Sequence, residues 1–249
     1  ICEGLVGSEM CIRDSLEPMF EVMYLMRKFT VLIFSIMFIL PGCIDSGNEA
    51  DSIFHGELIT SGKSISEFTL LTSENTTYDF KQNTEGKVTV IAFLFTNCYD
   101  ICPVVTYNLR HIHESLNDTM LDKIEFITIT VDPWRDNTTI LEEWKQSTKS
   151  YWTHLTVADT QPSSQDMATL TQVWNDFDVG FKIEENTTES NTSARHHPSS
   201  YDYNIAHSTG TVLLDHKGNQ RIWWGDYDWI IDLVKEDILN LVAEAEAEQ

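Results

Sequence analysis

The chain has 249 residues and a net charge of −23 at pH 7, because 39 acidic residues outnumber 16 basic ones. Such an acidic surface argues against nucleic acid as a partner and against electrostatic docking on anionic lipid. The length allows one domain with appendages or two small domains.

Residues 26–43 have the pattern of a signal peptide. Arg27 and Lys28 precede an apolar run over 31–40, which is too short for a comfortable membrane span. A small residue then precedes Cys43, as at the end of a lipoprotein signal. We expect a lipid on Cys43, with an uncleaved membrane anchor as the alternative.

Residues 1–25 make no sense as part of that signal, and we expect them to lie outside the native protein. The native start would then be the methionine that opens the signal. This expectation removes Cys2 and Cys11 from the cysteine count. With Cys43 assigned to the lipid, Cys98 and Cys102 are the only pair left.

Residues 44–64 are rich in polar residues and glycine, and they predict a flexible tether. The folded domain is expected over 65–249. Residues 68–71 and 77–80 flank a polar turn and predict an opening β-hairpin.

Two cysteines follow the most apolar stretch of this domain. Residues 90–95 form a continuous apolar run, typical of a strand buried on both faces of a sheet. Pro103 fits the first turn of a helix that apolar residues at helical spacing predict over 104–116. Cys98 and Cys102 therefore lie at a strand-to-helix turn, where a helix N-terminus favours a thiolate. Their spacing allows a shared metal ion, a disulfide or two buried cysteines.

The remaining elements alternate between strands and helices, which predicts an α/β fold with a parallel βαβ unit. Residues 184–200 lack apolar periodicity and predict an exposed loop inserted into this order. Gly218 and Asn219 are expected to supply the positive φ angles of the last hairpin turn. The expected elements are strand 124–131, helix 136–149, strand 153–158, helix 165–177, hairpin 211–215 with 220–224, and helix 228–245.

Polar residues follow the strand at 124–131, at the sheet edge where α/β folds place their sites. Asp132, Arg135 and Asp136 are expected to form a strand-end turn and to cap the next helix. We expect Asp132 and Arg135 to support a site rather than to take part in its chemistry.

Three segments, in this order, resemble motifs of the Sco/SenC family. Residues 96–103, Thr-Asn-Cys-Tyr-Asp-Ile-Cys-Pro, resemble its C-x-x-x-C-P signature. Residues 131–136 resemble its V-D-P-x-R-D motif, and 207–209 resemble its distal histidine motif. The resemblance covers about residues 65–240. It implies a thioredoxin-like fold, with a central mixed sheet flanked by helices and an N-terminal hairpin extension.

The resemblance also implies a copper site formed by Cys98, Cys102 and His207. Two thiolates and one imidazole suit copper, whereas zinc would normally take a fourth ligand. Asp100 matches a frequent acidic residue of the family and is expected to orient the loop or a partner. Many relatives have an acidic residue before the histidine, where this chain has Ala206, so that a carboxylate to orient the imidazole is missing or supplied elsewhere.

Together with the signal pattern, the resemblance implies an extracytoplasmic copper metallochaperone, anchored to the cell membrane, that delivers copper to the copper-bearing subunit of cytochrome c oxidase. Other copper chaperones or thioredoxin-like reductases are further expected partners. In the inserted loop, His196 and His197 are either auxiliary copper ligands or solvated residues.

The alternative is a thiol–disulfide oxidoreductase that reduces the cysteines of an acceptor before metal loading. Cys98 and Cys102 would then form a redox-active disulfide. Thioredoxin-like reductases generally have two residues between their cysteines and a cis-proline before the last hairpin. This chain has three residues there and no proline next to His207. Both departures favour metal binding, although the sequence leaves open whether the chain is an enzyme.

Overall fold

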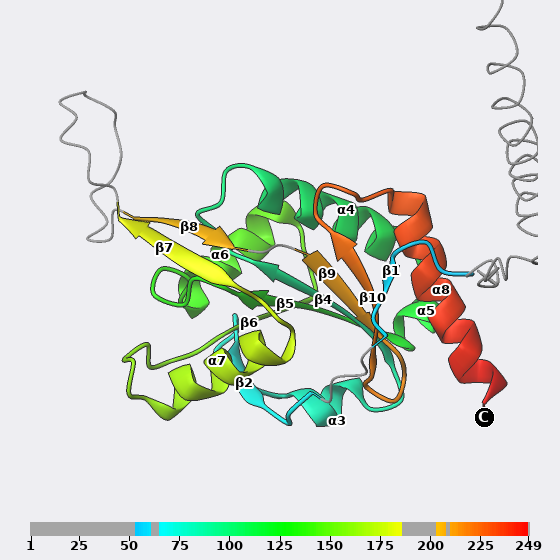
Figure 1. The fold of residues 1–249 in the computed structure, drawn as a ribbon, viewed down its shortest axis with the longest axis horizontal. Helices are drawn as coiled ribbons and strands as arrows, with labels where there is room; N and C mark the ends of the chain where they lie inside the picture. The colour runs from blue at the N-terminus through cyan, green and yellow to red at the C-terminus, as the bar shows by residue number, and fades with distance from the viewer. Residues whose placement is uncertain (1–52, 61–64, 186–202, 208–209, 249) are drawn as a thin grey trace, which may run out of the picture. The chain divides into compact units, whose positions relative to one another are not determined.

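The structure is a computed structural model, and it describes residues 53–60, 65–185, 203–207 and 210–248 (Figure 1). The expected signal region with Cys43 lies outside these ranges. His196 and His197 of the expected loop also lie outside them.

The described strands form one large mixed sheet and one small sheet. The order in the large sheet is β1-β10-β9-β4-β5-β6-β2-β3. Its strands are β1 (Glu57–Leu58), β2 (Thr69–Thr72), β3 (Thr77–Asp79), β4 (Val88–Leu94), β5 (Ile124–Thr130), β6 (Thr153–Thr156), β9 (Gly210–Leu214) and β10 (Gln220–Gly225). The small sheet contains β7 (Phe181–Glu185) and β8 (Tyr203–His207).

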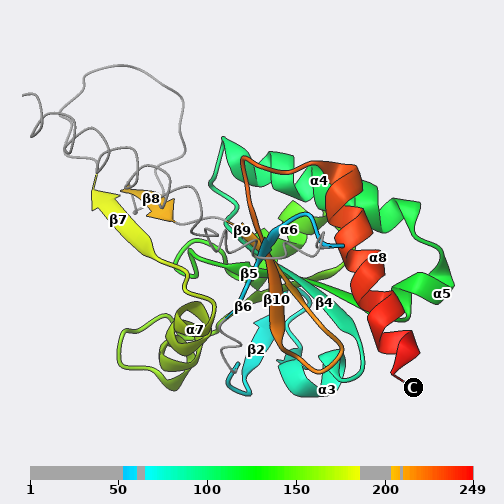
Figure 2. The same cartoon turned by 45° about the vertical axis from the view of Figure 1, so that its right-hand side comes forward.

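Helices flank both faces of the large sheet. The described helices are α3 (Phe80–Thr84), α4 (Ile101–Ser115), α5 (Asp118–Leu121), α6 (Thr138–Thr148), α7 (Gln165–Asp176) and α8 (Ile231–Ala247). Helix α4 contacts α6 and α8 on one face, and α7 covers part of the other (Figures 1 and 2). The expected α/β class is confirmed, and β2 with β3 is the expected N-terminal hairpin. Over the described ranges, the helices are all too short or too polar to cross a membrane.

Strand β4 is the centre of the large sheet. All seven of its residues are buried, which explains its continuous apolar run. It pairs in parallel with β5, so that Leu94 lies opposite Thr130. It pairs antiparallel with β9, where Ala92 lies opposite Thr211. The end of β4 therefore lies between the end of β5 and the start of β9.

The folded part begins earlier than the sequence predicts. Strand β1, within the expected tether, pairs antiparallel with β10 at the edge of the large sheet. The tether prediction over 44–64 is therefore wrong for residues 57–58. Two residues are too few to show an alternating pattern, so only pairing with β10 defines this strand.

The small sheet of β7 and β8 was also missed. Residues 181–185 pair with 203–207, and the pairing is confined to these two strands. The expected loop at 184–200 overlaps the end of β7, so the loop prediction is wrong for residues 184–185. Residues 186–200 lie outside the described residues.

Two details at the C-terminal end also differ from expectation. Gly218 has the expected positive φ of 81°, but Asn219 does not have a positive φ. Instead, the Asn219 backbone N–H donates to the Asp215 carboxylate at 2.9 Å, and this bond closes the turn. Helix α8 starts at Ile231, three residues later than predicted, because Asp228 forms a turn with Gly225.

Asp237 of α8 attaches the N-terminal segment to the domain. Its fully buried carboxylate accepts the backbone N–H groups of His55 and Gly56, at 2.8 and 2.9 Å. The indole Nε1–H of Trp224 donates to the same carboxylate at 3.0 Å. One side chain thus joins three separate parts of the chain.

We predict that Asp237→Ala lowers the free energy of unfolding by about 3 kcal/mol, because it leaves buried donors without their acceptor. Urea denaturation of the purified domain would measure this change. The matched control is Glu143→Ala, which removes a carboxylate from the exposed surface of α6 and should change stability little. Equal stability of the two variants would contradict the prediction.

Candidate metal site

The cysteines lie where the sequence places them, at the turn from β4 into α4. The Cys98 backbone N–H donates to the Phe95 carbonyl at 3.4 Å, within the turn. Cys98 is half-buried, whereas Cys102 lies in the first turn of α4 and is fully buried. Pro103 follows in that same turn, where a missing N–H costs no helix hydrogen bond. Both cysteines are free thiols in the structure.

The two thiols have opposite shifts in pKa. A hydrogen bond from the Cys102 thiol, together with the backbone N–H groups of Asp100, Ile101 and Cys102, lowers the pKa of Cys98 to about 6, although burial opposes this shift. The Cys102 N–H lies 3.4 Å from the Cys98 sulfur. The bond to Cys98 and then burial raise the pKa of the Cys102 thiol. Cys98 is therefore a thiolate at neutral pH and Cys102 a thiol.

Asp100 lies between the cysteines and is exposed. It occupies the N-cap position of α4, but its side chain makes no capping hydrogen bond. The Asp100 side chain therefore does not orient the loop by capping α4. A role of Asp100 towards a partner stays a prediction.

His207 is the last residue of β8, where its backbone pairs with Phe181 of β7. Its side chain lies outside the described side chains. After His207 the chain continues into β9, which starts at Gly210 and pairs beside the end of β4. The backbone of His207 therefore approaches the same edge of the sheet as the cysteines. Among the side chains that the structure describes, no three His, Cys, Asp or Glu groups could hold a metal ion.

The turn after β5 is buried and rich in hydrogen bonds. Asp132 and Asp136 are both fully buried. The Asp136 carboxylate accepts the Thr96 backbone N–H at 3.2 Å and the Thr130 hydroxyl at 2.6 Å. Burial raises the pKa of Asp136 to about 6, against the effect of these hydrogen bonds. Asp132 forms an ion pair with Arg135 and accepts the hydroxyl of Tyr203.

The predicted helix cap was wrong in one respect. Asn137 is the N-cap of α6, and its side chain accepts the Ile140 backbone N–H at 3.1 Å. Asp132, Arg135 and Asp136 form the preceding turn instead. Thr96 and Tyr203, which contact this turn, were not identified from the sequence. They lie 40 and 71 residues away from their partners, and no local pattern marks such contacts.

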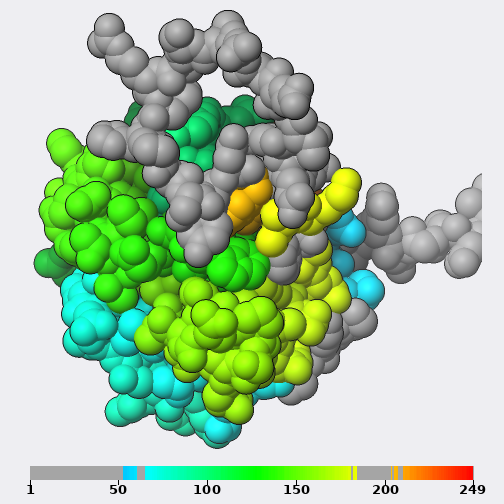
Figure 3. All heavy atoms as spheres, turned by 90° about the vertical axis from the view of Figure 1, so that its left-hand side faces the viewer, coloured from blue at the N-terminus to red at the C-terminus, as the bar shows by residue number. Residues whose placement is uncertain are grey.

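Figure 3 shows the surface of the molecule at the end that carries β7 and β8. The yellow surface of β7 and the orange surface of β8 lie next to each other above α7. Part of the strand that carries His207 is therefore visible at this surface, although its Ile205 is buried.

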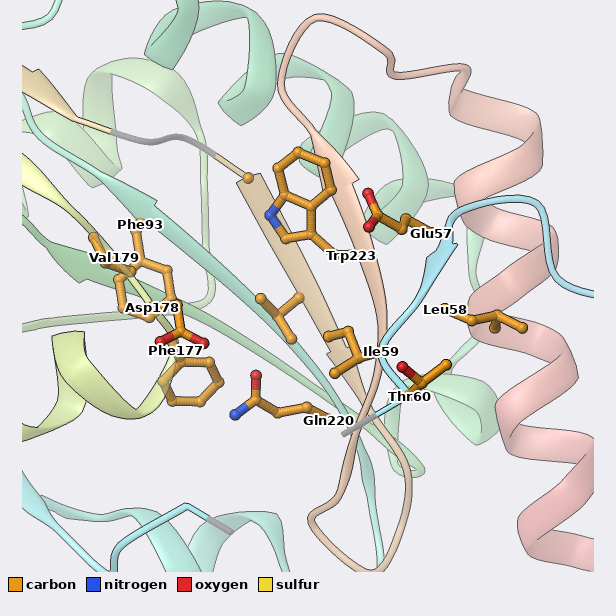
Figure 4. A pocket seen from close by; sticks show the side chains of 12 residues that line it. Glu57, Leu58, Ile59, Thr60, Phe93, Phe177, Asp178, Val179, Gln220 and Trp223 are labelled. Carbon is orange, nitrogen blue, oxygen red and sulfur yellow. The ribbon is translucent and has the colours of Figure 1, made fainter. Parts of the chain in front are cut away.

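A pocket of about 400 Å³ lies elsewhere, on the sheet face that α7 only partly covers. Figure 4 shows Phe177 and Val179 on one side of it and Ile59 and Trp223 on the other. Neither cysteine lines this pocket. The pocket is therefore separate from the cysteine turn, by which we mean residues 95–102, between the end of β4 and the first turn of α4.

Comparison with known proteins gives a consistent match. A family model described as SCO1/SenC matches residues 58–228. A SCO2-like protein of Rickettsia prowazekii is 29% identical over 157 residues, which make up 63% of this chain and 64% of that protein. The chain thus spans just under two thirds of the length of this relative.

Solved structures share the fold. Yeast Sco1 with copper bound has a TM-score of 0.56 at 23% identity, covering 75% of this chain and 95% of that chain. A SCO1/SenC family lipoprotein from Bacillus anthracis has a TM-score of 0.57 at 21% identity, covering 73% and 96%. BsSco, described with a disulfide switch and as a member of the Sco family of cytochrome c oxidase assembly proteins, has a TM-score of 0.53 at 17% identity, covering 76% and 98%.

These structures show the fold, and the family model shows the relationship. Its match extends from β1 to the turn before α8 and includes the cysteine turn, the buried turn after β5 and the segment around His207. Because this match covers more than half of the chain, the chain belongs to the SCO1/SenC family.

Proposed function

We propose that this chain is a copper metallochaperone that binds one copper ion through Cys98, Cys102 and His207. The observation that carries the proposal is the pair of free thiols at the start of α4, one of them a thiolate at neutral pH, in a member of the SCO1/SenC family. Thiolate and imidazole are ligands that suit Cu(I), and Cu(II) with added ligands. Copper bound to yeast Sco1 supports the choice of metal.

The paired thiols fit the needs of metal transfer. Cys98 offers a half-exposed thiolate that can meet an incoming ion, whereas Cys102 must release its proton when it binds. A site with so few protein ligands can pass its ion to an acceptor by exchange of one ligand at a time. Transfer by ligand exchange requires that the acceptor reach the cysteine turn.

We further propose that the acceptor is the copper-bearing subunit of cytochrome c oxidase, and that the protein acts at the extracytoplasmic face of the cell membrane. The description of BsSco as an oxidase assembly protein supports the acceptor. The lipoprotein from Bacillus anthracis supports a lipid anchor, for which Cys43 is the candidate. Other copper chaperones and thioredoxin-like reductases remain proposed partners.

The cysteine geometry also favours a second candidate function, thiol–disulfide exchange. The Cys98 thiolate would attack an acceptor disulfide and form a mixed disulfide, releasing one acceptor thiolate. Cys102 would lose its proton and displace the second acceptor thiolate, which leaves a Cys98–Cys102 disulfide and a reduced acceptor. A thioredoxin-like reductase would then restore the two thiols. The disulfide switch described for BsSco supports this candidate.

We predict that reduced protein lacking the signal region binds about one copper ion per chain. His207→Ala should weaken copper binding at least about 100-fold, because loss of a ligand should exceed the effect of losing an outer-shell partner. Competition with a chelator of known affinity would measure this change.

His111→Ala is the matched control, because it removes an exposed imidazole from α4 and should leave the affinity nearly unchanged. Equal affinities of wild type and His207→Ala would reject the ligand set. Reduction of an acceptor disulfide without copper, lost in Cys98→Ser but kept in His207→Ala, would instead favour thiol–disulfide exchange.

We predict that the rate of Cys98 alkylation by iodoacetamide rises with pH, with a midpoint near pH 6. The folded pKa is lower than that of an ordinary cysteine, so the thiolate is present above pH 6 and is lost as the pH falls through 6. Mass spectrometry of the alkylated protein would give the rate at each pH.

Cys102→Ala provides the control, because it removes the thiol that donates to Cys98. Its midpoint should move up towards the ordinary value of about 8.5. A wild-type midpoint already near that value would show that the turn does not stabilise the thiolate.

A further inference from the structure

The turn of residues 132–136 is held by hydrogen bonds and contacts the segment that leads into the cysteine turn. Within it, the backbone N–H groups of Arg135 and Asp136 donate to the Asp132 carbonyl, at 3.2 and 2.9 Å. The Thr156 hydroxyl of β6 donates to the Asp136 carbonyl at 2.7 Å. The fully buried side chains of Asp132 and Asp136 point to different partners. The turn therefore has two separate points of attachment.

Asp136 attaches the turn to the cysteines. Its carboxylate accepts both the backbone N–H and the hydroxyl of Thr96, which lies two residues before Cys98. The Val131 N–H also donates to the Leu94 carbonyl at 3.1 Å, which continues the pairing of β5 with β4. A backbone hydrogen bond and hydrogen bonds to the Asp136 side chain thus hold the segment before the cysteines beside the end of β5.

Asp132 and Arg135 attach the turn to the strand that carries His207. The Tyr203 hydroxyl donates to Asp132, and Arg135 Nη1 donates to the Tyr203 carbonyl at 2.9 Å. The Arg135 guanidinium also stacks on the Tyr203 ring, 3.9 Å from its centroid. Tyr203 is the first residue of β8 and His207 is its last.

These contacts matter because the large sheet does not hold β8. Among the described strands, β8 pairs with β7 alone. Ile205 packs against the core, but this apolar contact does not fix how the strand is oriented along its length. The residue before the histidine is an exposed alanine, Ala206, which cannot orient an imidazole by a hydrogen bond. Tyr203 therefore ties the start of β8 to the turn of residues 132–136, in addition to the pairing of β8 with β7.

We propose that the turn of residues 132–136 fixes the distance between the two halves of the metal site. In this arrangement Asp136 positions the cysteines through Thr96, and Asp132 with Arg135 positions His207 through Tyr203. All of these are positioning residues, because none of them needs to touch the metal. The inference rests on the proposed function, since it takes His207 as a ligand.

The test compares copper affinities of variants in two backgrounds, wild type and His207→Ala. Tyr203→Phe removes only the hydroxyl that contacts Asp132, and Arg135→Lys removes the stacking and the planar donor pair. Each should weaken copper binding about tenfold in the wild-type background, the lower end of the effect of outer-shell partners, because Tyr203 acts on His207 only through β8. Neither should weaken it in the His207→Ala background, where the positioned ligand is already gone.

Thr96→Val acts on the other half of the site, because it removes the hydroxyl that Asp136 holds. It should weaken copper binding by a similar factor in both backgrounds, since both retain the cysteines. Tyr151→Phe is the matched control for Tyr203→Phe, because Tyr151 is 59% exposed and should have no effect in either background. The EPR spectrum of the Cu(II) form gives a second readout, because Tyr203→Phe should reduce the nitrogen hyperfine signal of the imidazole.

The outcomes separate the two levels of the proposal. If His207→Ala weakens binding but Tyr203→Phe and Arg135→Lys do not, the positioning role is overturned and the metal site stands. Equal losses from Tyr203→Phe in both backgrounds would mean that it acts through general stability, which also overturns the role. If wild type and His207→Ala bind copper equally, the proposed ligand set fails and the inference fails with it.

Discussion

The parallel pairing of β4 with β5 is the constraint on which the candidate site depends. Both strands are almost wholly buried, and their register places Leu94 opposite Thr130. Both strands therefore end at the same edge of the sheet. The cysteine turn follows β4 there, and the turn of residues 132–136, called the buried acidic turn below, follows β5. Because parallel strands end on the same side, the pairing brings the two turns to one edge, where the hydrogen bonds from Thr96 to Asp136 join them.

The opposite pKa shifts of Cys98 and Cys102 follow from their positions at the start of α4. Backbone N–H groups at a helix N-terminus stabilise negative charge on the first sulfur, and the buried second sulfur donates to it. The same arrangement suits a soft metal ion and an attack on a disulfide, because both begin with one accessible thiolate. Membership of the SCO1/SenC family and the three-residue spacing between Cys98 and Cys102 are the reasons why the proposed function puts copper binding before disulfide exchange.

The buried acidic turn contacts both the segment before the cysteines and the strand that carries His207. Carboxylates that are fully buried are stable only with good hydrogen-bond partners, and Asp132 and Asp136 draw theirs from opposite sides. The need to satisfy these charges thus links the cysteine turn to β8, which lacks backbone pairing with the large sheet.

The sequence alone determined the order of the main elements, the strand-to-helix place of the cysteines and the family motifs, because these depend on local periodicity and short spacings. It could not show β1, β7 or β8, which are short and are defined by their pairing partners. It predicted that Asp132 and Arg135 support the site, a role that stays a prediction. It did not show that Tyr203 contacts Asp132 and Arg135, or that Thr96 contacts Asp136. Only the tertiary structure decided those contacts, because burial of two carboxylates selects partners from distant parts of the chain.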